Sequence, residues 1–237
     1  MSSGDPRVHA ALARNPLLAG LAAEDLSALA RLARARPLAA GEPLAAQRAW
    51  IVLAGCLRVS SVSPEGREFV YEMLGPGSFH GLGDVLRGGP PRVQAHAAGA
   101  ASAAALDAPA LLALLAQRPH LWRPFSSLLQ ARLESAMNLL RANQSGPMRQ
   151  RVARRLLAQA ASCGKTFGPD RGPILRVSQA DLAGMLSASR SRVNQALRHM
   201  EGEGLLRVRY RAIELLDAAR LQQAAGDGEP APLMRAA

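Results

Sequence analysis

Leucine recurs at helical spacing through the first part of the chain. Its positions there are Leu17, Leu18, Leu21, Leu26, Leu29 and Leu32. No β-branched residue follows Val8 in this stretch, and β-branched side chains are the ones that fit helices less well. The pattern predicts helices over residues 8–36, interrupted at Gly20.

From Pro37 onward, the pattern changes to short apolar runs separated by glycine and proline. The runs cover residues 50–53, 57–60, 69–74 and 93–98. Leu57 and Val59 alternate with polar neighbours, which is the period of a half-buried strand. Short strands interrupted this often predict a β-sandwich or barrel. The sequence Ser-Pro-Glu-Gly at residues 63–66 predicts a hairpin turn between two of them.

A long amphipathic helix is predicted after the sandwich. Pro109 begins a short helix over residues 110–117, and residues 120–143 then contain no glycine. Apolar residues recur there at steps of three and four: Trp122, Phe125, Leu129, Leu133, Ala136 and Leu140. Leu121, Leu128 and Leu139 widen this stripe. The helix either packs only on its own sandwich or also pairs with a second copy, and the breadth of the stripe favours a dimer helix.

Positive charge is concentrated in the C-terminal third. The chain has 237 residues, 49% of them hydrophobic and 20% charged, a globular composition for one or two domains. The net charge is +11, and residues 149–220 hold fourteen basic and six acidic residues. Nucleic acid is the usual partner of such an excess. No secretory or membrane-spanning segment is recognisable, so we expect a cytoplasmic protein without a membrane partner.

Residues 177–200 have the pattern of a helix-turn-helix. Ser178 and Asp181 predict a capping box at the first helix, and Ser189 predicts the N-cap of the second. Three residues of the second helix are expected to face inward: Val193, Leu197 and Met200. The alternation in residues 205–215 predicts two short strands forming a wing, with Arg207, Arg209 and Arg211 near the DNA backbone.

The outer face of the second helix carries only side chains that form hydrogen bonds. Arginine can contact guanine with two hydrogen bonds, and asparagine and glutamine can pair with adenine. Serines at helix N-termini suit phosphate oxygens. The candidate DNA-binding residues are Ser178, Gln179, Ser189, Arg190, Ser191, Arg192, Asn194, Gln195 and Arg198.

The order of sandwich, long helix and winged helix-turn-helix resembles the Crp/Fnr family of bacterial transcription regulators. Residues 51–59, residues 74–81 with Pro91-Arg92, and residues 178–197 carry the resemblance. It implies an α+β fold with an N-terminal cyclic-nucleotide-binding-like β-sandwich of the jelly-roll type. It further implies a homodimer joined by the long helix, a near-palindromic operator in double-stranded DNA, and contact with RNA polymerase.

The same resemblance suggests a domain organisation. Residues 1–118 are expected to form the effector domain, and residues 119–144 the dimerisation helix. Residues 145–222 are expected to form the winged helix-turn-helix domain, with a hinge at Ser145–Pro147. Residues 223–237 are expected to be a disordered tail.

The effector pocket implied by the resemblance departs from the pattern of cyclic-nucleotide binders. Its candidate residues are Phe79, Gly81, Leu82, Arg92 and Val93. Arg92 stands where an arginine meets the cyclic phosphate. Leu82 stands in place of the glutamate that accepts the ribose hydroxyl, and Val93 in place of a small hydroxyl residue. Because leucine cannot accept that hydrogen bond, another small acid bound through Arg92, or no effector at all, is expected in preference to a cyclic nucleotide.

Other sensor chemistries remain open to different degrees. Haem would need axial ligands, for which His80, His96 or Cys56 could serve. An iron–sulfur cluster ligated by four cysteines is excluded within one chain, because Cys56 and Cys163 are the only cysteines.

Two rival functions differ from a DNA-binding regulator. An enzyme is disfavoured, because the five histidines show no metal-ligand spacing and no nucleophile elbow, phosphate loop or dinucleotide fingerprint occurs. A ligand-binding module whose basic domain docks a protein is the other, and the salt dependence of DNA binding would distinguish it. The family often has glutamate at the place of Ser191, arginine at that of Gln195 and glycine at that of Arg211, so its usual operator is not assumed.

Overall fold

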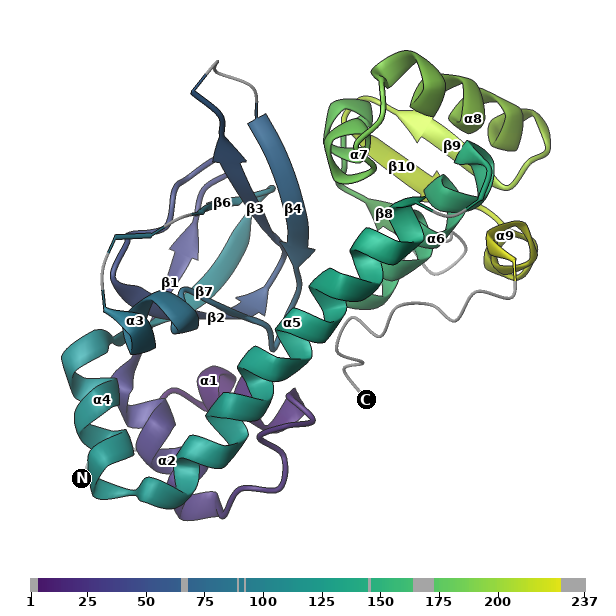
Figure 1. The fold of residues 1–237 in the computed structure, drawn as a ribbon. Coiled ribbons are helices and arrows are strands. Elements are labelled where there is room, and N and C mark those ends of the chain that lie inside the picture. The colour runs from purple at the N-terminus through teal and green to yellow at the C-terminus, as the bar shows by residue number, and fades with distance from the viewer. Residues whose placement is uncertain are drawn as a thin grey trace. The chain divides into compact units, whose positions relative to one another are not determined.

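The structure is a computed structural model that describes residues 4–64, 68–88, 90–91, 93–144, 146–163 and 173–226. The chain forms two compact units, which we describe separately (Figure 1). The N-terminal unit comprises Met1–Val59 and Met73–Leu133, and the C-terminal unit comprises Ser60–Glu72 and Glu134–Leu233.

Two short helices begin the N-terminal unit, α1 (Pro6–Arg14) and α2 (Ala23–Leu32). The prediction of helix over residues 33–36 is wrong, because this segment begins strand β1 (Ala33–Leu38). Strand β1 pairs antiparallel with β7 (Ala101–Asp107), from Ala33 opposite Leu106 to Leu38 opposite Ala101. The ladder hydrogen bonds supplied by β7 outweigh the local helical preference of an alanine- and arginine-rich segment.

The expected sandwich is present as two antiparallel sheets. One contains β1, β7, β2 (Arg48–Ala54) and β5 (Phe79–His80), in that order. The other has the order β4 (Glu68–Leu74), β3 (Leu57–Val62) and β6 (Gln94–Ala97). Strands β3 and β4 are neighbours, as the predicted hairpin requires, although residues 65–67 of its turn lie outside the described part of the chain. A short helix, α3 (Leu82–Arg87), follows β5.

The four-stranded sheet separates two hydrophobic cores. In β2, Ala49 and Ile51 belong to a core shared with the helices, whereas Trp50 and Val52 belong to a core shared with the other sheet. Alternate residues of a strand point to opposite faces, so this one strand serves both cores. The first core is completed by α1, α2 and α4 (Ala108–Gln117), which lie together at one side of the strands (Figure 1).

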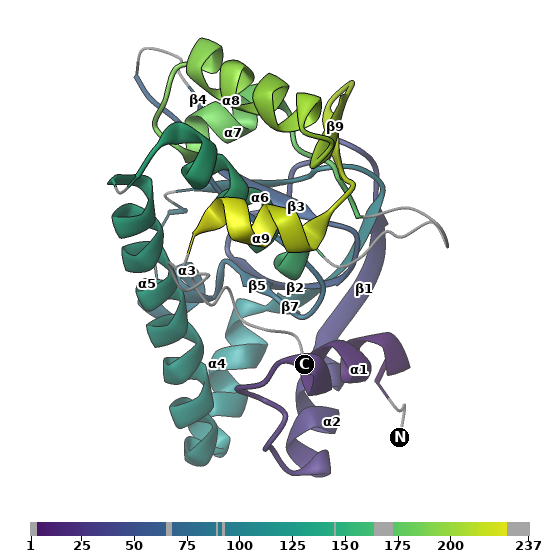
Figure 2. The same ribbon diagram turned by 90° about the vertical axis from the view of Figure 1, so that its right-hand side faces the viewer.

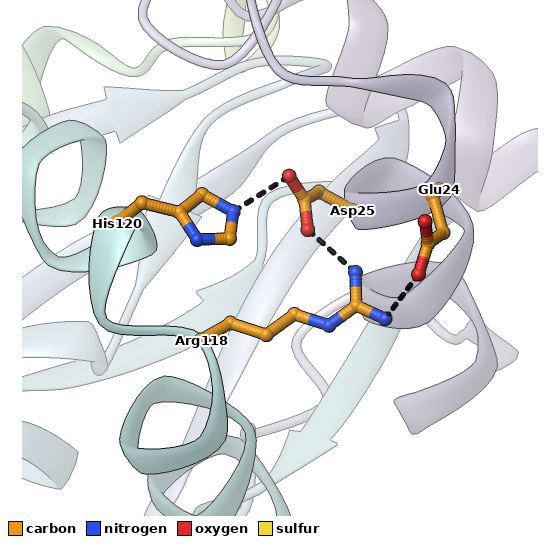
Figure 3. A network of polar contacts seen from close by, with 4 residues as sticks. All are labelled: Glu24, Asp25, Arg118 and His120. Atoms are coloured by element: carbon orange, nitrogen blue, oxygen red, sulfur yellow. Dashed lines mark hydrogen bonds and ion pairs between the residues drawn. The ribbon is translucent and has the colours of Figure 1, made fainter.

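A polar network fixes the segment that leads into the long helix (Figure 3). Arg118, at the end of α4, donates hydrogen bonds to Asp25 at 2.6 Å and to Glu24 at 2.7 Å, both on α2. His120 Nε2, in the turn η1 (Pro119–Leu121), lies 2.8 Å from the other oxygen of Asp25. These bonds lower the pKa of Asp25, the bond from Arg118 contributing most. The long helix α5 (Trp122–Gln144) starts directly after this turn, as predicted.

The C-terminal unit is built on helix α6 (Met148–Ser162). The helix-turn-helix consists of α7 (Gln179–Met185) and α8 (Arg190–Gly202), which pack against each other. A small sheet has the order β8 (Ile174–Leu175), β10 (Ala212–Leu215) and β9 (Leu206–Arg209). Helix α9 (Ala218–Ala225) lies against α6 (Figure 2). The expectation of a disordered tail is therefore wrong for residues 223–225, and residues 227–237 lie outside the described part of the chain. Within the described ranges, no helix combines the length and the apolar character needed to cross a bilayer.

Candidate nucleic-acid interface and effector site

The predicted capping box at the start of α7 is confirmed. The backbone N–H of Asp181 donates to Ser178 Oγ at 3.0 Å, and the backbone N–H of Ser178 donates to Asp181 Oδ2 at 3.0 Å. The Ser178 hydroxyl also donates to Asp181 Oδ2 at 2.7 Å. These bonds satisfy donors that a helix start leaves open, and they hold the Ser178 side chain at the end of α7, while Gln179 follows as a half-buried first residue.

The turn between α7 and α8 is tight. Ser187 has a φ of 48°, a left-handed conformation that usually belongs to glycine, and the N–H of Ala188 donates to the carbonyl of Ala183 at 3.0 Å. Ser189 then caps α8 by accepting a hydrogen bond from the N–H of Arg192 at 3.4 Å, as the sequence predicts. The turn therefore fixes the direction in which α8 leaves.

Helix α8 presents a polar face to solvent. Val193, Leu197 and Met200 are buried as predicted. The exposed candidates are Ser189, Arg190, Ser191, Arg192, Gln195 and Arg198. Asn194 is half-buried, and its Oδ1 atom is buried without a hydrogen-bond partner among the residues described. The three arginines of this face form no ion pair with any part of the chain that the structure describes, so their charge is directed to solvent.

The wing is present, but its arginines differ from one another. Glu214, whose side chain is 2% exposed, accepts hydrogen bonds from Arg209 at 2.8 and 2.6 Å, and Arg207 lies 3.9 Å from the same oxygen. These two side chains therefore serve an internal carboxylate. At the tip, Tyr210 is 92% exposed, and Arg211 is exposed with a φ of 50°. Sequence reasoning did not separate Arg211 from the other two.

Several arginines of α6 also have internal roles. Arg149 pairs with Glu203, and Arg154 donates to the carbonyl of Ala225 at 2.8 Å. Arg155 is buried, donates to the sulfur of Met185 at 3.1 Å, and has its pKa lowered by burial to about 10. The positive excess of this unit is thus divided between structural arginines and those of α8 and the wing tip.

The candidate effector residues have different environments. Phe79 and Leu82 belong to the core shared with the helices. There the rings of Phe79 and Phe125 pack edge to face, with their centroids 6.3 Å apart. Gly81 precedes α3 with a φ of 75°, and a β-carbon there would lie 2.3 Å from the carbonyl oxygen of Arg48. Val93 is half-buried beside the core between the sheets. Arg92 lies outside the described residues.

His80 is a buried polar residue next to these candidates. It pairs with Trp50 across the sheet, so it shares the face that looks toward the core between the sheets. It is 7% exposed, and its Nδ1 has no hydrogen-bond partner in the described residues. Burial, with a smaller effect of the nearby Arg132, lowers its pKa to about 4, so the ring is neutral at pH 7.

Ligands for a metal or haem are sparse in the described part of the chain. His96 also has a buried Nδ1 without a partner there, and it lies on β6, in the other sheet from His80. Cys56 is not a free thiol. Within the described residues, no three histidine, cysteine or acidic side chains are grouped so as to hold a metal ion.

Comparison with known proteins gives matches in both units. The cyclic nucleotide-binding domain matches residues 37–118, and the Crp-like helix-turn-helix domain matches residues 150–224. A "CRP-like cAMP-activated global transcriptional regulator" of Mycobacterium tuberculosis is 29% identical over 191 residues, covering 79% of this chain and 83% of that protein. The transcriptional regulator LdrP of Thermus thermophilus is 31% identical over 174 residues, covering 73% and 84%.

A solved structure supports the fold. TTHB099, a transcriptional regulator of the CRP family from Thermus thermophilus, superimposes with a TM-score of 0.69 at 24% identity, covering 85% of this chain and all of that one. The relatives are transcription regulators and not enzymes. The two domain matches in this order, the relatives and the exposed polar face of α8 lead to one conclusion: the chain belongs to the Crp/Fnr family of DNA-binding transcription regulators.

Proposed function

We propose that the protein is a homodimeric, sequence-specific regulator whose α8 enters the major groove. The observation that carries this is the row of exposed hydrogen-bonding side chains on α8, with three arginines that no described carboxylate neutralises. Arg190 contacts guanine and Gln195 pairs with adenine, whereas the buried Oδ1 of Asn194 is not available to a base. Ser191 and Gln195 make different contacts from the glutamate and arginine common in the family, so the half-site differs from the family's usual one.

Replacing Arg190 tests the base contact. Arg190→Ala should weaken binding by roughly 1–3 kcal/mol on an operator selected from random duplexes, and should relax the preference at one base pair. Fluorescence anisotropy on the selected duplex and on single-base variants of it measures both. Arg31→Ala, an exposed arginine of α2, is the control. Equal weakening on every sequence would reduce Arg190 to a phosphate contact.

Salt dependence separates DNA binding from docking to a protein. Binding through phosphates releases counterions, so affinity for random duplex DNA should fall steeply as salt rises. A flat response would favour a protein partner for the basic unit.

The exposed apolar row on α5 supports the dimer. Leu133, Met137 and Leu140 follow at steps of four and three and are 56%, 50% and 63% exposed. Leu121, in the preceding turn η1, and Phe125 and Leu128, early in α5, are buried in the chain's own core, so the stripe serves both surfaces. Pairing along this row gives two α8 helices about one DNA turn apart, ~34 Å, on a near-palindrome. The bound dimer then meets RNA polymerase, as family membership implies.

Arg211 and Tyr210 form the DNA-contacting part of the wing in this proposal. Arg207 and Arg209 both lie near the carboxylate of Glu214, which partly neutralises their charge. Arg211 has no such partner among the described residues, and its neighbour Tyr210 projects from the same turn. The wing therefore contacts the backbone beside the groove that α8 occupies.

The sandwich acts as the sensor, with Arg92 as the anion-binding residue. An effector shifts the population between DNA-competent and incompetent arrangements of the dimer. Cyclic AMP is the first probe, because one relative is named as cAMP-activated. Leu82 and Val93 lack the hydrogen-bonding groups of cyclic-nucleotide binders, so we expect no saturable heat on calorimetric titration with cyclic AMP.

Native mass spectrometry of the purified protein should instead show a co-purifying small acid, which Arg92→Ala loses. Arg87→Ala, which removes an arginine paired with Asp84, is the matched control. Saturable cyclic AMP binding that Arg92→Ala abolishes would restore the cyclic-nucleotide alternative. A Soret absorbance band would indicate haem.

A further inference from the structure

An arginine from outside the helix-turn-helix lies at the turn between α7 and α8. Arg151, on α6, donates a hydrogen bond from Nη2 to the carbonyl of Leu186, which ends α7. The Nε atom of Arg151 is buried and has no partner among the described residues. The bond to Leu186 holds the guanidinium beside the turn, one residue before Ser187.

Arg192 lies on the other side of this turn, in the first turn of α8. It is the third residue of α8, its N–H is bonded to the Ser189 cap, and its side chain is exposed. Helix α6, which carries Arg151, packs against α8, which carries Arg192. The pKa of Arg151 is lowered, mainly by burial and also by the charge of Arg192. No carboxylate in the described residues forms an ion pair with either guanidinium.

We propose that Arg151 and Arg192 bind one backbone phosphate of the DNA between them, at the entrance of α8 into the major groove. The two arginines flank this turn, and an anion bound by both offsets the repulsion between their like charges. A phosphodiester presents two non-bridging oxygens, and each guanidinium presents N–H donors in a planar fork. The contact carries no base information and sets the register of α8 on the duplex. This inference rests on the proposed DNA-binding function.

The test measures affinity for the selected operator and for random duplex across a range of potassium chloride concentrations. The variants are Arg151→Gln, Arg192→Gln and the double variant. Arg154→Gln is the control, because it removes the same charge from the same helix at a side chain bonded to Ala225. Each single variant should lose roughly tenfold in affinity on both duplexes. The measured quantity is the slope of the logarithm of affinity against the logarithm of salt concentration. Because both arginines bind one phosphate, this slope should become shallower by about 0.9 per half-site in the double variant, the value for one phosphate contact and not for two.

Neutral methylphosphonates placed one at a time in the operator locate the phosphate. At one position in each half-site, the neutral group should weaken binding of the wild-type protein but leave binding of the double variant unchanged. Arg151 also supports the fold through Leu186, so thermal unfolding of each variant is measured. Arg192→Gln removes no side-chain hydrogen bond to any residue that the structure describes, so it keeps the test decisive.

Three results would overturn the inference while leaving the regulator intact: wild-type affinity in both single variants, additive loss of two phosphates, or an equal loss in Arg154→Gln. Absence of salt-dependent DNA binding by the wild-type protein would instead refute the proposed function itself.

Discussion

At the scale of single residues, His80 makes the stability of the N-terminal unit depend on pH. The folded protein holds its pKa at about 4, against an ordinary 6.5. Between these values the unfolded chain binds a proton that the folded chain does not. The free energy of unfolding should therefore fall as pH drops from about 6.5 towards 4, by up to about 3 kcal/mol.

Urea unfolding followed by tryptophan fluorescence measures this effect, because Trp50 and Trp122 both lie in the N-terminal unit. His80→Leu should flatten the profile in this pH range. His199→Gln, at an exposed histidine of α8, should leave the profile unchanged. An equally steep profile in His80→Leu would show that other groups cause the dependence.

Some residue roles could be read from the sequence, because they depend on neighbours three or four positions away. The caps at Ser178 and Ser189 and the buried side of α8 are of this kind. The partners of Arg209 and Arg155 are not, since Glu214 and Met185 reach them only after strands and helices have packed. A count of charges therefore gives the sign of the surface but not which arginines remain available.

At the scale of elements, the Asp25 network joins α2 to the turn that precedes α5. Asp25→Asn removes the charge that pairs with Arg118 and His120, and should lower the stability of the N-terminal unit by on the order of 1–3 kcal/mol. Because the folded state lowers the pKa of Asp25, its stabilising effect is present above the ordinary carboxyl value and is lost as pH falls through the lower folded value.

Urea unfolding at pH 7 and at pH 3 checks both statements, since the difference between wild type and Asp25→Asn should shrink at the lower pH. Asp5→Asn, at a carboxylate whose arginine partner is two residues away on the surface, is the control and should cost little. A difference that is the same at both pH values would contradict the electrostatic explanation.

Element boundaries were predictable where the signal is local. Proline and glycine marked most of the strands and α4, and the caps marked α7 and α8. Strand β1 was predicted as helix because its pairing with β7 joins residues some seventy positions apart. The strand β8 has two residues and is defined by its pairing with β10. Two residues are too few for a hydrophobic period, so the sequence pattern could not predict this strand. Phe79 and Leu82 were candidate pocket residues because of the resemblance to the Crp/Fnr family. Their burial in the core shared with the helices depends on how α3 packs, which the sequence pattern does not show.

At the scale of the whole molecule, the proposed dimer makes DNA binding depend on the apolar row of α5. Leu140→Glu places a charge in the proposed seam, so it should shift the protein to monomers and lower operator affinity at least tenfold, since a monomer contacts a single half-site. Analytical ultracentrifugation and anisotropy measure the two effects. Leu112→Glu changes a similarly apolar, partly exposed side chain on α4 and should affect neither. A monomeric wild-type protein with full operator affinity would refute the dimer.

The backbone conformation of Arg211 affects the stability of the C-terminal unit and its proposed contact with DNA in opposite ways. A left-handed conformation costs an arginine on the order of 1 kcal/mol that glycine would not lose. Selection for heat resistance alone would therefore install glycine at this hairpin tip, and would discard the one wing cation that the carboxylate of Glu214 does not hold. An arginine at this tip therefore accepts a backbone cost, which the proposed wing contact with a phosphate would offset.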